Sequence, residues 1–398
     1  MKESFRLKNI CLYCNWKVKV TENGFYVAAI HAAYLRAFFN SNNGKIILLS
    51  NISRSPVNDG DVFFDSDKIC LISLPAFSSY FSSVRYFFDI ASCIKKAYRT
   101  AEFFYIRTPE PFAWLFGVWN VFGHKTLNYH VVSNPLEVIW SNKKNRFLNR
   151  VLKFSTFYPE YLAVMISAYF NKISCNGYSA KDKLPFFVKK RAKVLIESTK
   201  LESDFDCPLL KQDDYFNPEC IKFLIVTRFF PGKGLDVALK AFSKVTSDKK
   251  YELLIAGDGP EFNLINSLSN KLGLSDRVKF LGNVKNGNDL NKVYNDSHIF
   301  INPSLSETGP RVLLEAMAYN LYCISTEVGY ARYVLSDEKG NVHGRIITPG
   351  SVNEMEVAII SVLDNFKDIM SKAEKGRQLS KRFTLDSFVK SVILDNIS

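Results

Sequence analysis

The chain has 398 residues, of which 47% are hydrophobic, and it holds only 19 glycines and 14 prolines. This length predicts two or three domains with cores of their own, and the composition excludes a disordered or collagen-like chain. The formal net charge is +13, and residues 1–200 alone hold 28 lysines and arginines against 13 acidic residues. Because the whole positive excess lies in the first half, we expect two domains that face different partners.

The eight cysteines are scattered without the spacing of a disulfide framework, which is typical of a reducing cytoplasm. Cys11 and Cys14 have the spacing of a redox or metal motif, but they lie in the apolar run ICLYC, so we interpret them as core cysteines. The uncharged stretches 111–124 and 161–171 are shorter than the ~20 residues that span a bilayer. Since the N-terminus also lacks a signal-peptide pattern, we expect a cytoplasmic protein without a transmembrane helix.

In the first half, short apolar segments alternate with amphipathic ones. A helix is predicted over about 25–39, and strands are predicted over 10–14, 45–50, 68–74, 102–107 and 126–132. This alternation is typical of a parallel sheet, in which ligands lie beyond the carboxyl ends of the strands. His130 stands near such an end, where it either contacts a ligand or serves as a core histidine. The aspartates of 59–67 could form a metal-binding pair, but we interpret them as a solvated loop and predict no metal site.

The segment 142–162 is rich in cations and aromatic residues and predicts an amphipathic helix. Such a helix can lie in a membrane interface, and a second helix over 84–99 would extend the same surface. The alternative is that both apolar faces pack on the N-terminal sheet. The confinement of the positive charge to this half favours an anionic inner-membrane surface. The cations expected at that surface are Lys143, Lys144, Arg146 and Arg150.

The segment 199–220 is acidic, contains two prolines and predicts a domain boundary. Beyond it, a helix is predicted over 234–245, and strands over 222–228, 251–257, 278–282 and 298–303 predict a second parallel sheet. Arg228 at a strand end and Lys233 at a helix start either converge on one anion or are solvated surface charges. The Gly-Asp-Gly-Pro turn of 257–260 resembles half of a dinucleotide fingerprint, although any tight strand-to-helix turn needs such residues.

A further strand-to-helix turn lies within 301–320, with Glu307 in the turn and Glu315 eight residues later. Gly309 and Pro310 are predicted at the N-cap and first-turn positions. The amides of residues 311–313 are then expected to remain free and to form an anion site. Glu315 lies in the apolar run LLEAMA, where its carboxylate needs a partner and could accept hydrogen bonds from vicinal hydroxyls. The alternative is that both glutamates are surface charges of the helix.

Several of these segments together resemble the retaining glycosyltransferases of family 4. The motifs TRFFPGKGLDVALKAF, LLIAGDGPE, VKFLGNV, PSLSETGPRVLLEAMA and TEVGY…GRIITPG follow the order of that family over about 220–350. The resemblance implies an α/β protein of the GT-B fold, with two Rossmann-like domains facing a central cleft. The implied parts are an acceptor-binding domain over 1–200, a linker over 201–220, a nucleotide-sugar-binding domain over 221–375, and a C-terminal helix over 376–398 that crosses back to the first domain.

By this resemblance Arg228 and Lys233 hold the donor diphosphate, while Glu307 contacts the donor sugar. Glu315 contacts the ribose. The other implied donor-binding residues are Gly282, Asn283 and Val284 near the base, together with Thr308, Gly309, Pro310, Arg311 and Val312. Many members have Glu-Gly-Phe-Gly where this chain has Glu-Thr-Gly-Pro, which removes the amide at 310, so we expect the Arg311 N–H to serve instead. Gly24 is either a neighbour of the phosphates or an ordinary turn glycine, and His130 is a candidate contact to the donor sugar or the acceptor.

The predicted activity is the transfer of a sugar from a UDP- or GDP-sugar co-substrate to a hydroxyl of a lipid-linked saccharide, with retention of the anomeric configuration and without a metal or other cofactor. The positive groups of the second domain would neutralise the leaving diphosphate. The implied role is the assembly of O-antigen, capsule or exopolysaccharide at the cytoplasmic face of the inner membrane. One alternative is a nucleotide-sugar epimerase on the same fold. The other is a nucleic-acid-binding protein, suggested by the pI of about 9.2, but the chain carries no recognisable binding module.

Overall fold

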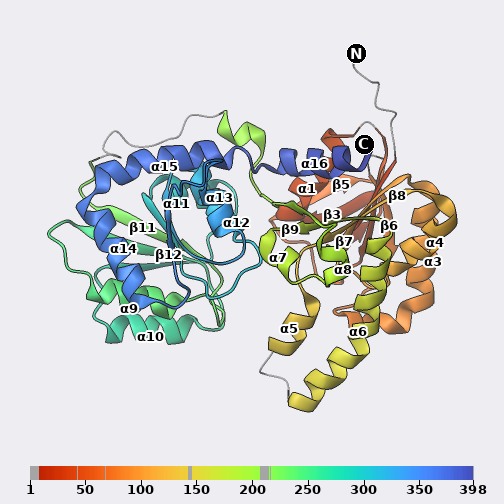
Figure 1. Ribbon diagram of the computed structural model, residues 1–398, viewed down its shortest axis with the longest axis horizontal. Coiled ribbons are helices and arrows are strands. Elements are labelled where there is room, and N and C mark those ends of the chain that lie inside the picture. Colours follow the sequence, from red (N-terminus) through yellow and green to blue (C-terminus); the bar gives the residue numbers. More distant parts are fainter. Residues whose placement is uncertain are drawn as a thin grey trace. The chain divides into compact units, whose positions relative to one another are not determined.

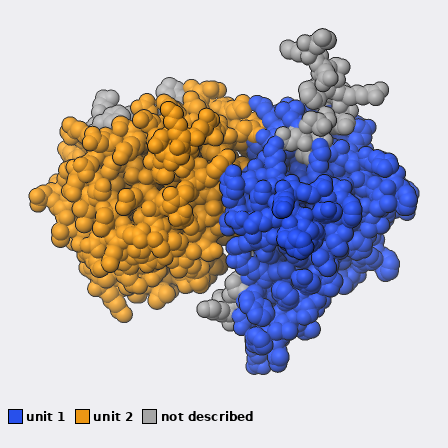
Figure 2. All heavy atoms as spheres, in the orientation of Figure 1, with its two compact units in different colours: residues 1–195, 388–398 blue, residues 196–387 orange. Residues whose placement is uncertain are grey.

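The computed structural model describes residues 9–42, 44–67, 69–141, 146–206, 215 and 217–397. The chain divides into two compact units (Figures 1 and 2). The first unit comprises residues 1–195 together with 388–398, and the second comprises residues 196–387. Among the described residues, no helix combines the length and the apolar character needed to cross a membrane.

The first unit is built on a seven-stranded sheet in which every neighbouring pair is parallel (Figure 1). Its strands, in spatial order, are β10 (Lys193–Leu195), β9 (Lys172–Asn176), β8 (Thr126–Val131), β7 (Phe103–Thr108), β1 (Ile10–Tyr13), β4 (Ile46–Asn51) and β6 (Ile69–Leu74). The central strands are buried along their whole length because helices cover both faces. The buried Cys11 and the adjoining Cys14 confirm the interpretation as core cysteines.

Helices pack on the two faces of this sheet through alternate residues of its strands. On β7, Phe104 packs against Phe116, whereas the next residue, Tyr105, packs against Phe38 and Phe388 on the opposite face. The helices of this unit are α1 (Ala29–Asn40), α2 (Tyr80–Ser83), α3 (Phe87–Thr100), α4 (Trp114–Gly123), α5 (Pro135–Ser141), α6 (Phe147–Tyr169), α7 (Tyr178–Asp182), α8 (Phe186–Lys189) and α16 (Leu385–Ile397), which enters the unit at Phe388.

One predicted helix start was wrong. The helix predicted from residue 25 begins at residue 29, because Gly24–Ala28 forms strand β3, which pairs with β2 (Lys19–Thr21) and β5 (Asp61–Asp65) in a small antiparallel sheet. The helix predicted from residue 84 begins with a 3-10 turn over Val84–Tyr86 that precedes α3. Helix α6 begins at Phe147, and residues 142–145 of the predicted helix lie outside the described residues.

The second unit contains a six-stranded parallel sheet, which confirms the second predicted sheet. Its strands, in spatial order, are β13 (Val278–Gly282), β12 (Tyr251–Ala256), β11 (Ile221–Val226), β14 (Ile299–Asn302), β15 (Tyr322–Thr326) and β16 (Arg345–Ile347). Its helices are α9 (Leu235–Lys244), α10 (Phe262–Lys271), α11 (Asn288–Asn295), α12 (Arg311–Ala318), α13 (Ala331–Leu335), α14 (Val352–Asp364) and α15 (Phe366–Ser380), and a 3-10 helix covers Glu202–Phe205. The loops after β11, β12, β13 and β14 end at one edge of the sheet, as parallel strands require.

Candidate functional site

A cavity of about 630 Å³ lies at this edge of the second unit, and we call it the C-terminal pocket. Segments from the loops after β11, β12, β13 and β14 line it together with the start of α12. Nine residues predicted from the sequence are among its lining residues: Arg228, Lys233, Asn283, Val284, Glu307, Gly309, Pro310, Arg311 and Val312. The predicted residues Gly282, Thr308 and Glu315 lie outside that lining set. The fold thus brings most of the predicted donor-binding residues together.

Lys233 and Glu307 form an ion pair at the wall of the C-terminal pocket. Their side chains are 21% and 22% exposed, so the pair is largely shielded from water. Ser304 Oγ donates a second hydrogen bond of 3.2 Å to the same carboxylate oxygen. The predicted cation, Lys233, and the predicted sugar-contacting acid, Glu307, therefore share one site.

A glycine explains how Lys233 reaches this position. Gly234 has a φ of +68°, and a Cβ built on it would lie 2.0 Å from the Pro303 carbonyl oxygen. Because a side chain here would clash, only glycine lets the loop before α9 approach the loop after β14 this closely. The Leu305 N–H also donates to the Gly232 carbonyl at 2.8 Å, which ties the two loops together.

The Gly-Asp-Gly-Pro turn after β12 serves the packing of two loops. Gly257 has a φ of +136°, and its Cβ would lie 1.8 Å from the Thr227 carbonyl oxygen. The Phe229 N–H donates to the Asp258 carbonyl at 2.9 Å. These contacts hold the loop that carries Arg228, whose guanidinium lies 5.5 Å from the centre of the Phe230 ring.

The start of α12 differs from the prediction. Pro310 is the N-cap residue and the helix begins at Arg311, so Gly309 and Pro310 each lie one position earlier than expected. The Arg311 N–H donates to the Gly309 carbonyl at 3.0 Å, and the Leu313 N–H donates to the Pro310 carbonyl at 2.9 Å. Two of the three amides expected to remain free are therefore bonded within the turn, so that expectation was wrong for residues 311 and 313. Contact of the Arg311 amide with an anion stays a prediction.

Glu315 has the partners that its apolar surroundings require. Its carboxylate accepts a hydrogen bond of 2.6 Å from Thr199 Oγ1 and one of 3.0 Å from the Tyr294 hydroxyl. Burial and the neighbouring carboxylate together raise the pKa of Tyr294 well above its usual value, so this hydroxyl stays protonated and donates. The expected partner is thus confirmed, while contact with a ribose stays a prediction.

Two predicted residues, Gly24 and His130, belong to the first unit. His130 is fully buried, with its Nδ1 2.9 Å from Ser174 Oγ and its ring against Tyr105 and Phe388. The expectation that it faces a ligand was wrong, because the two covering aromatic rings leave its side chain no exposure. A Cβ on Gly24 would lie 2.2 Å from the Phe64 carbonyl oxygen, so the pairing of β3 with β5 requires glycine there.

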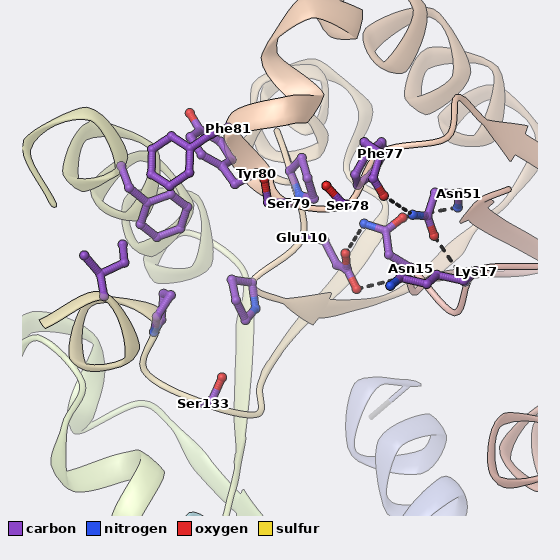
Figure 3. A pocket seen from close by; sticks show the side chains of 15 residues that line it. Asn15, Lys17, Asn51, Phe77, Ser78, Ser79, Tyr80, Phe81, Glu110 and Ser133 are labelled. Atoms are coloured by element: carbon purple, nitrogen blue, oxygen red, sulfur yellow. Dashed lines mark hydrogen bonds between the residues drawn. The ribbon is translucent and has the colours of Figure 1, made fainter. Parts of the chain in front are cut away.

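A second cavity, of about 450 Å³, lies in the first unit and was not predicted from the sequence (Figure 3). We call it the N-terminal pocket. Its polar lining includes Asn15 after β1, Asn51 at the end of β4, and Glu110 after β7. Polar residues at the end of a buried strand, or two positions beyond it, are the signal that could have identified this cavity. Among the described residues, no group of three or more His, Cys, Asp or Glu is placed to hold a metal ion.

The predicted membrane helix exposes its apolar side chains. On α6, Phe147, Leu148 and Leu152 are 59%, 78% and 67% exposed, so the alternative that this face packs on the sheet was wrong for the first turns. Arg146 is exposed at the N-cap, whereas the Arg150 guanidinium donates to the Trp140 carbonyl at 3.0 Å. The predicted Lys143 and Lys144 lie outside the described residues.

The sequence of the second unit is similar to sequences of known glycosyltransferases. Residues 210–379 match the family of glycosyl transferases group 1. Over 116 residues, the chain is 34% identical to the phosphatidylinositol N-acetylglucosaminyltransferase gpi3 subunit of Schizosaccharomyces pombe, which covers 29% of this chain and 25% of that protein. The chain thus spans about a quarter of the length of the first curated relatives that it matches.

Solved structures resemble almost the whole chain. Anabaena Alr3699/HepE in complex with UDP has a TM-score of 0.68 at 14% identity and covers 98% of this chain and 99% of its own. WaaG, a glycosyltransferase involved in lipopolysaccharide biosynthesis, has a TM-score of 0.64 at 15% identity, with coverages of 96% and 98%. The predicted class of two Rossmann-like α/β domains, the fold of the GT-B glycosyltransferases, is confirmed.

Proposed function

We propose that the protein is a retaining glycosyltransferase that moves a sugar from a nucleotide-sugar donor to a hydroxyl of a lipid-linked saccharide. The observation that carries this proposal is the C-terminal pocket, in which Arg228, Lys233 and Glu307 line one cavity within the group 1 domain. The similarity to a structure in complex with UDP supports a nucleoside diphosphate as the ligand of this pocket.

The Lys233–Glu307 pair suggests how the donor binds. A diphosphate entering the pocket would compete with Glu307 for the Lys233 ammonium, because both anions need the same cation. Once released, the Glu307 carboxylate would accept hydrogen bonds from hydroxyls of the donor sugar. Binding would thus exchange a protein ion pair for contacts at both ends of the donor.

The same cations would act during the reaction. As the bond between the sugar and the diphosphate loosens, negative charge develops on the leaving group. Lys233 and Arg228, held in place by their loops, would stabilise that charge at little reorganisation cost. In this proposal the two side chains supply the positive charge that a UDP- or GDP-sugar needs, and no metal ion or other cofactor takes part.

The acceptor side of the proposal rests on the first unit. We propose that the first unit binds the acceptor, a lipid-linked saccharide used in O-antigen, capsule or exopolysaccharide assembly. This binding would take place at the cytoplasmic face of the inner membrane. The exposed apolar side chains of α6 and the positive excess of residues 1–200 support contact with an anionic lipid surface. The similarity to WaaG, and to a relative named for a phosphatidylinositol substrate, supports a lipid-borne acceptor.

The test of transfer uses the full chain, a panel of labelled UDP- and GDP-sugars, and a lipid-linked saccharide fraction as the acceptor. The expected result is labelled lipid together with an equal amount of released nucleoside diphosphate. The variant Arg228→Ala is expected to lower both signals together. Conversion of one nucleotide-sugar into another without release of the nucleotide would identify an epimerase and overturn the proposal.

The membrane contact is tested separately by flotation with vesicles of phosphatidylglycerol and phosphatidylethanolamine. Replacing both Leu148 and Leu152 with serine is expected to reduce binding at low salt without changing nucleotide binding. Phe186→Ser is the matched control, because this side chain is 86% exposed on another helix. Equal flotation of wild type and the double variant would remove α6 from the membrane contact.

A further inference from the structure

The N-terminal pocket lies where ligands bind in parallel sheets. Asn15, Asn51, Glu110 and Ser133 follow or end strands β1, β4, β7 and β8, which are four neighbours in the sheet. The remaining walls come from α2 and the segment before it, from α5, and from Phe157 of α6. The N-terminal pocket and the C-terminal pocket share no lining residue, and their lining residues belong to different units. The N-terminal pocket therefore has chemistry of its own.

The polar side of the N-terminal pocket is organised by hydrogen bonds (Figure 3). The Asn15 N–H donates to Glu110 Oε1 at 2.9 Å, and the Asn15 side chain donates to Oε2. Asn51 is held in turn, since its Nδ2 donates to the Phe77 carbonyl at 3.1 Å and its Oδ1 accepts from the Lys17 N–H at 3.1 Å. These groups are fixed before any ligand arrives, which lowers the cost of binding.

The chemistry of this polar side favours hydroxyl groups over phosphates. Each Glu110 oxygen bonded to Asn15 keeps a second lone pair that can accept a hydrogen bond from a ligand hydroxyl. Burial raises the pKa of Glu110 to about 8, so the carboxyl group can also donate near neutral pH. When ionised, the same carboxylate would repel a phosphate. A polyol satisfies the Asn15, Asn51 and Glu110 side chains better than an anion does, and the lining cation Lys17 can donate to a hydroxyl as well.

The opposite side of the pocket is aromatic. Tyr80 and Phe81 of α2 lie away from Glu110 and Asn15 in Figure 3. Tyr80 packs edge-on against Phe157 of α6, with ring centres 4.7 Å apart, and Ile139 of α5 completes this wall. Such a wall accepts the apolar face of a sugar ring or a hydrocarbon chain, while the polar side orients the hydroxyls.

Helix α6 connects this wall with the exposed apolar side chains described above. Phe157 lines the pocket, and Leu148 lies nine residues earlier on the same helix with 78% exposure. At 1.5 Å per residue, the two positions are about 14 Å apart along the helix axis. If α6 contacts the lipid surface, the pocket lies within a short distance of that surface.

From these observations we propose that the N-terminal pocket binds the terminal sugar of an acceptor that carries only a short saccharide on its lipid. Asn15 and Glu110 position the sugar hydroxyls, and Tyr80, Phe81 and Phe157 contact the ring and the adjoining carrier. The terminal sugar of a long lipid-linked polymer would lie too far from the lipid surface to occupy the pocket while α6 contacts that surface. The role of the bound saccharide as an acceptor rests on the proposed function. Binding of a saccharide in the pocket can be tested without any transfer.

The binding test uses octyl β-glucoside, octyl β-galactoside and octyl phosphate below their micelle concentrations, with calorimetry on the full chain. At least one glycoside is expected to bind more tightly than octyl phosphate. Ser133→Trp, which fills the cavity, should weaken glycoside binding at least tenfold, whereas the exposed control Ser66→Trp should not. Phe81→Ala, at a partly exposed position of the wall, should weaken glycoside binding about threefold or more. This variant replaces Ser133→Trp in the test if the Trp variant does not fold.

Absence of glycoside binding, tighter binding of octyl phosphate, or equal binding by wild type, Ser133→Trp and Phe81→Ala would each overturn the site. Because Glu110→Gln removes the negative charge, it should reduce the ratio of octyl glycoside affinity to octyl phosphate affinity. An unchanged ratio would contradict the proposed repulsion of phosphate by Glu110. A transfer assay then separates the two proposals. Glycoside binding without transfer to any acceptor would contradict the proposed function alone, while full transfer by Ser133→Trp would contradict the acceptor site alone.

The preference for a short saccharide is tested with two lipid-linked acceptors on the same carrier, one with a single sugar and one with a long polymer. The short acceptor is expected to have a KM at least tenfold lower with wild type, and Ser133→Trp should remove that difference. A lower KM for the polymer would overturn the assignment of a short saccharide.

Discussion

Replacing Lys233 with alanine should lower kcat/KM strongly while leaving the fold intact. Truncating one partner of a buried charge pair costs about 2–5 kcal/mol, which corresponds to roughly 30- to 5,000-fold. Because the Lys233 side chain is 21% exposed, solvent screening places the expected loss in the lower part of that range, roughly 30- to 300-fold. Stability should change by about 1 kcal/mol or less, since Glu307 keeps its hydrogen bond from Ser304.

The assay is titration calorimetry with UDP and GDP, followed by turnover with the nucleotide-sugar that binds. The matched control is Glu307→Gln, which removes the competitor for the lysine. This variant should bind the free nucleoside diphosphate at least as tightly as wild type and still turn over more slowly. Wild-type affinity in Lys233→Ala, or weaker diphosphate binding in Glu307→Gln, would refute the exchange of partners that we infer from the ion pair.

Three further changes probe separate parts of the structure. Glu315→Gln should weaken nucleotide binding about tenfold, because an NH2 donor replaces one of the two carboxylate oxygens that accept from Thr199 and Tyr294 and are predicted to accept from the ribose; unchanged calorimetry would remove it from the donor site. Glu160→Gln should flatten the pH dependence of stability. Burial raises the pKa of Glu160 from 4.5 to about 7, so the folded state binds a proton that the unfolded state releases. Wild type should therefore lose up to about 3 kcal/mol as the pH rises from 4.5 to above 7, and parallel urea-unfolding curves for the two proteins across this range would contradict that reasoning. Gly257→Ala should lower the melting temperature and abolish nucleotide binding, whereas Gly60→Ala, with open space around its Cβ, should change neither.

The sequence predicted the features that depend on neighbouring residues. Apolar runs such as 45–50 become buried strands wherever helices cover both faces of a sheet, so both parallel sheets could be found from the pattern alone. The lining of the C-terminal pocket was also accessible, because each of its motifs is a short strand-to-helix turn.

The features that escaped prediction depend on tertiary pairing or on local turn geometry. Residues 25–27 lie at the start of the predicted helix, but pairing with β5 makes them a strand, which their aromatic and β-branched side chains also favour. His130 ends inside the core because Phe388, more than 250 residues later, covers it. Asn15 and Glu110 come together only through the pairing of β1 with β7, which no single segment of the sequence reveals.

The most direct test of the central claim is nuclear magnetic resonance of the product formed from one nucleotide-sugar of defined anomeric configuration and a short lipid-linked acceptor. The account predicts a new glycosidic signal with the anomeric configuration of the donor, formed in equal amount with the released nucleoside diphosphate and reduced at least 30-fold in Lys233→Ala. A product of inverted configuration, or a changed nucleotide-sugar with no new glycosidic bond, would contradict it.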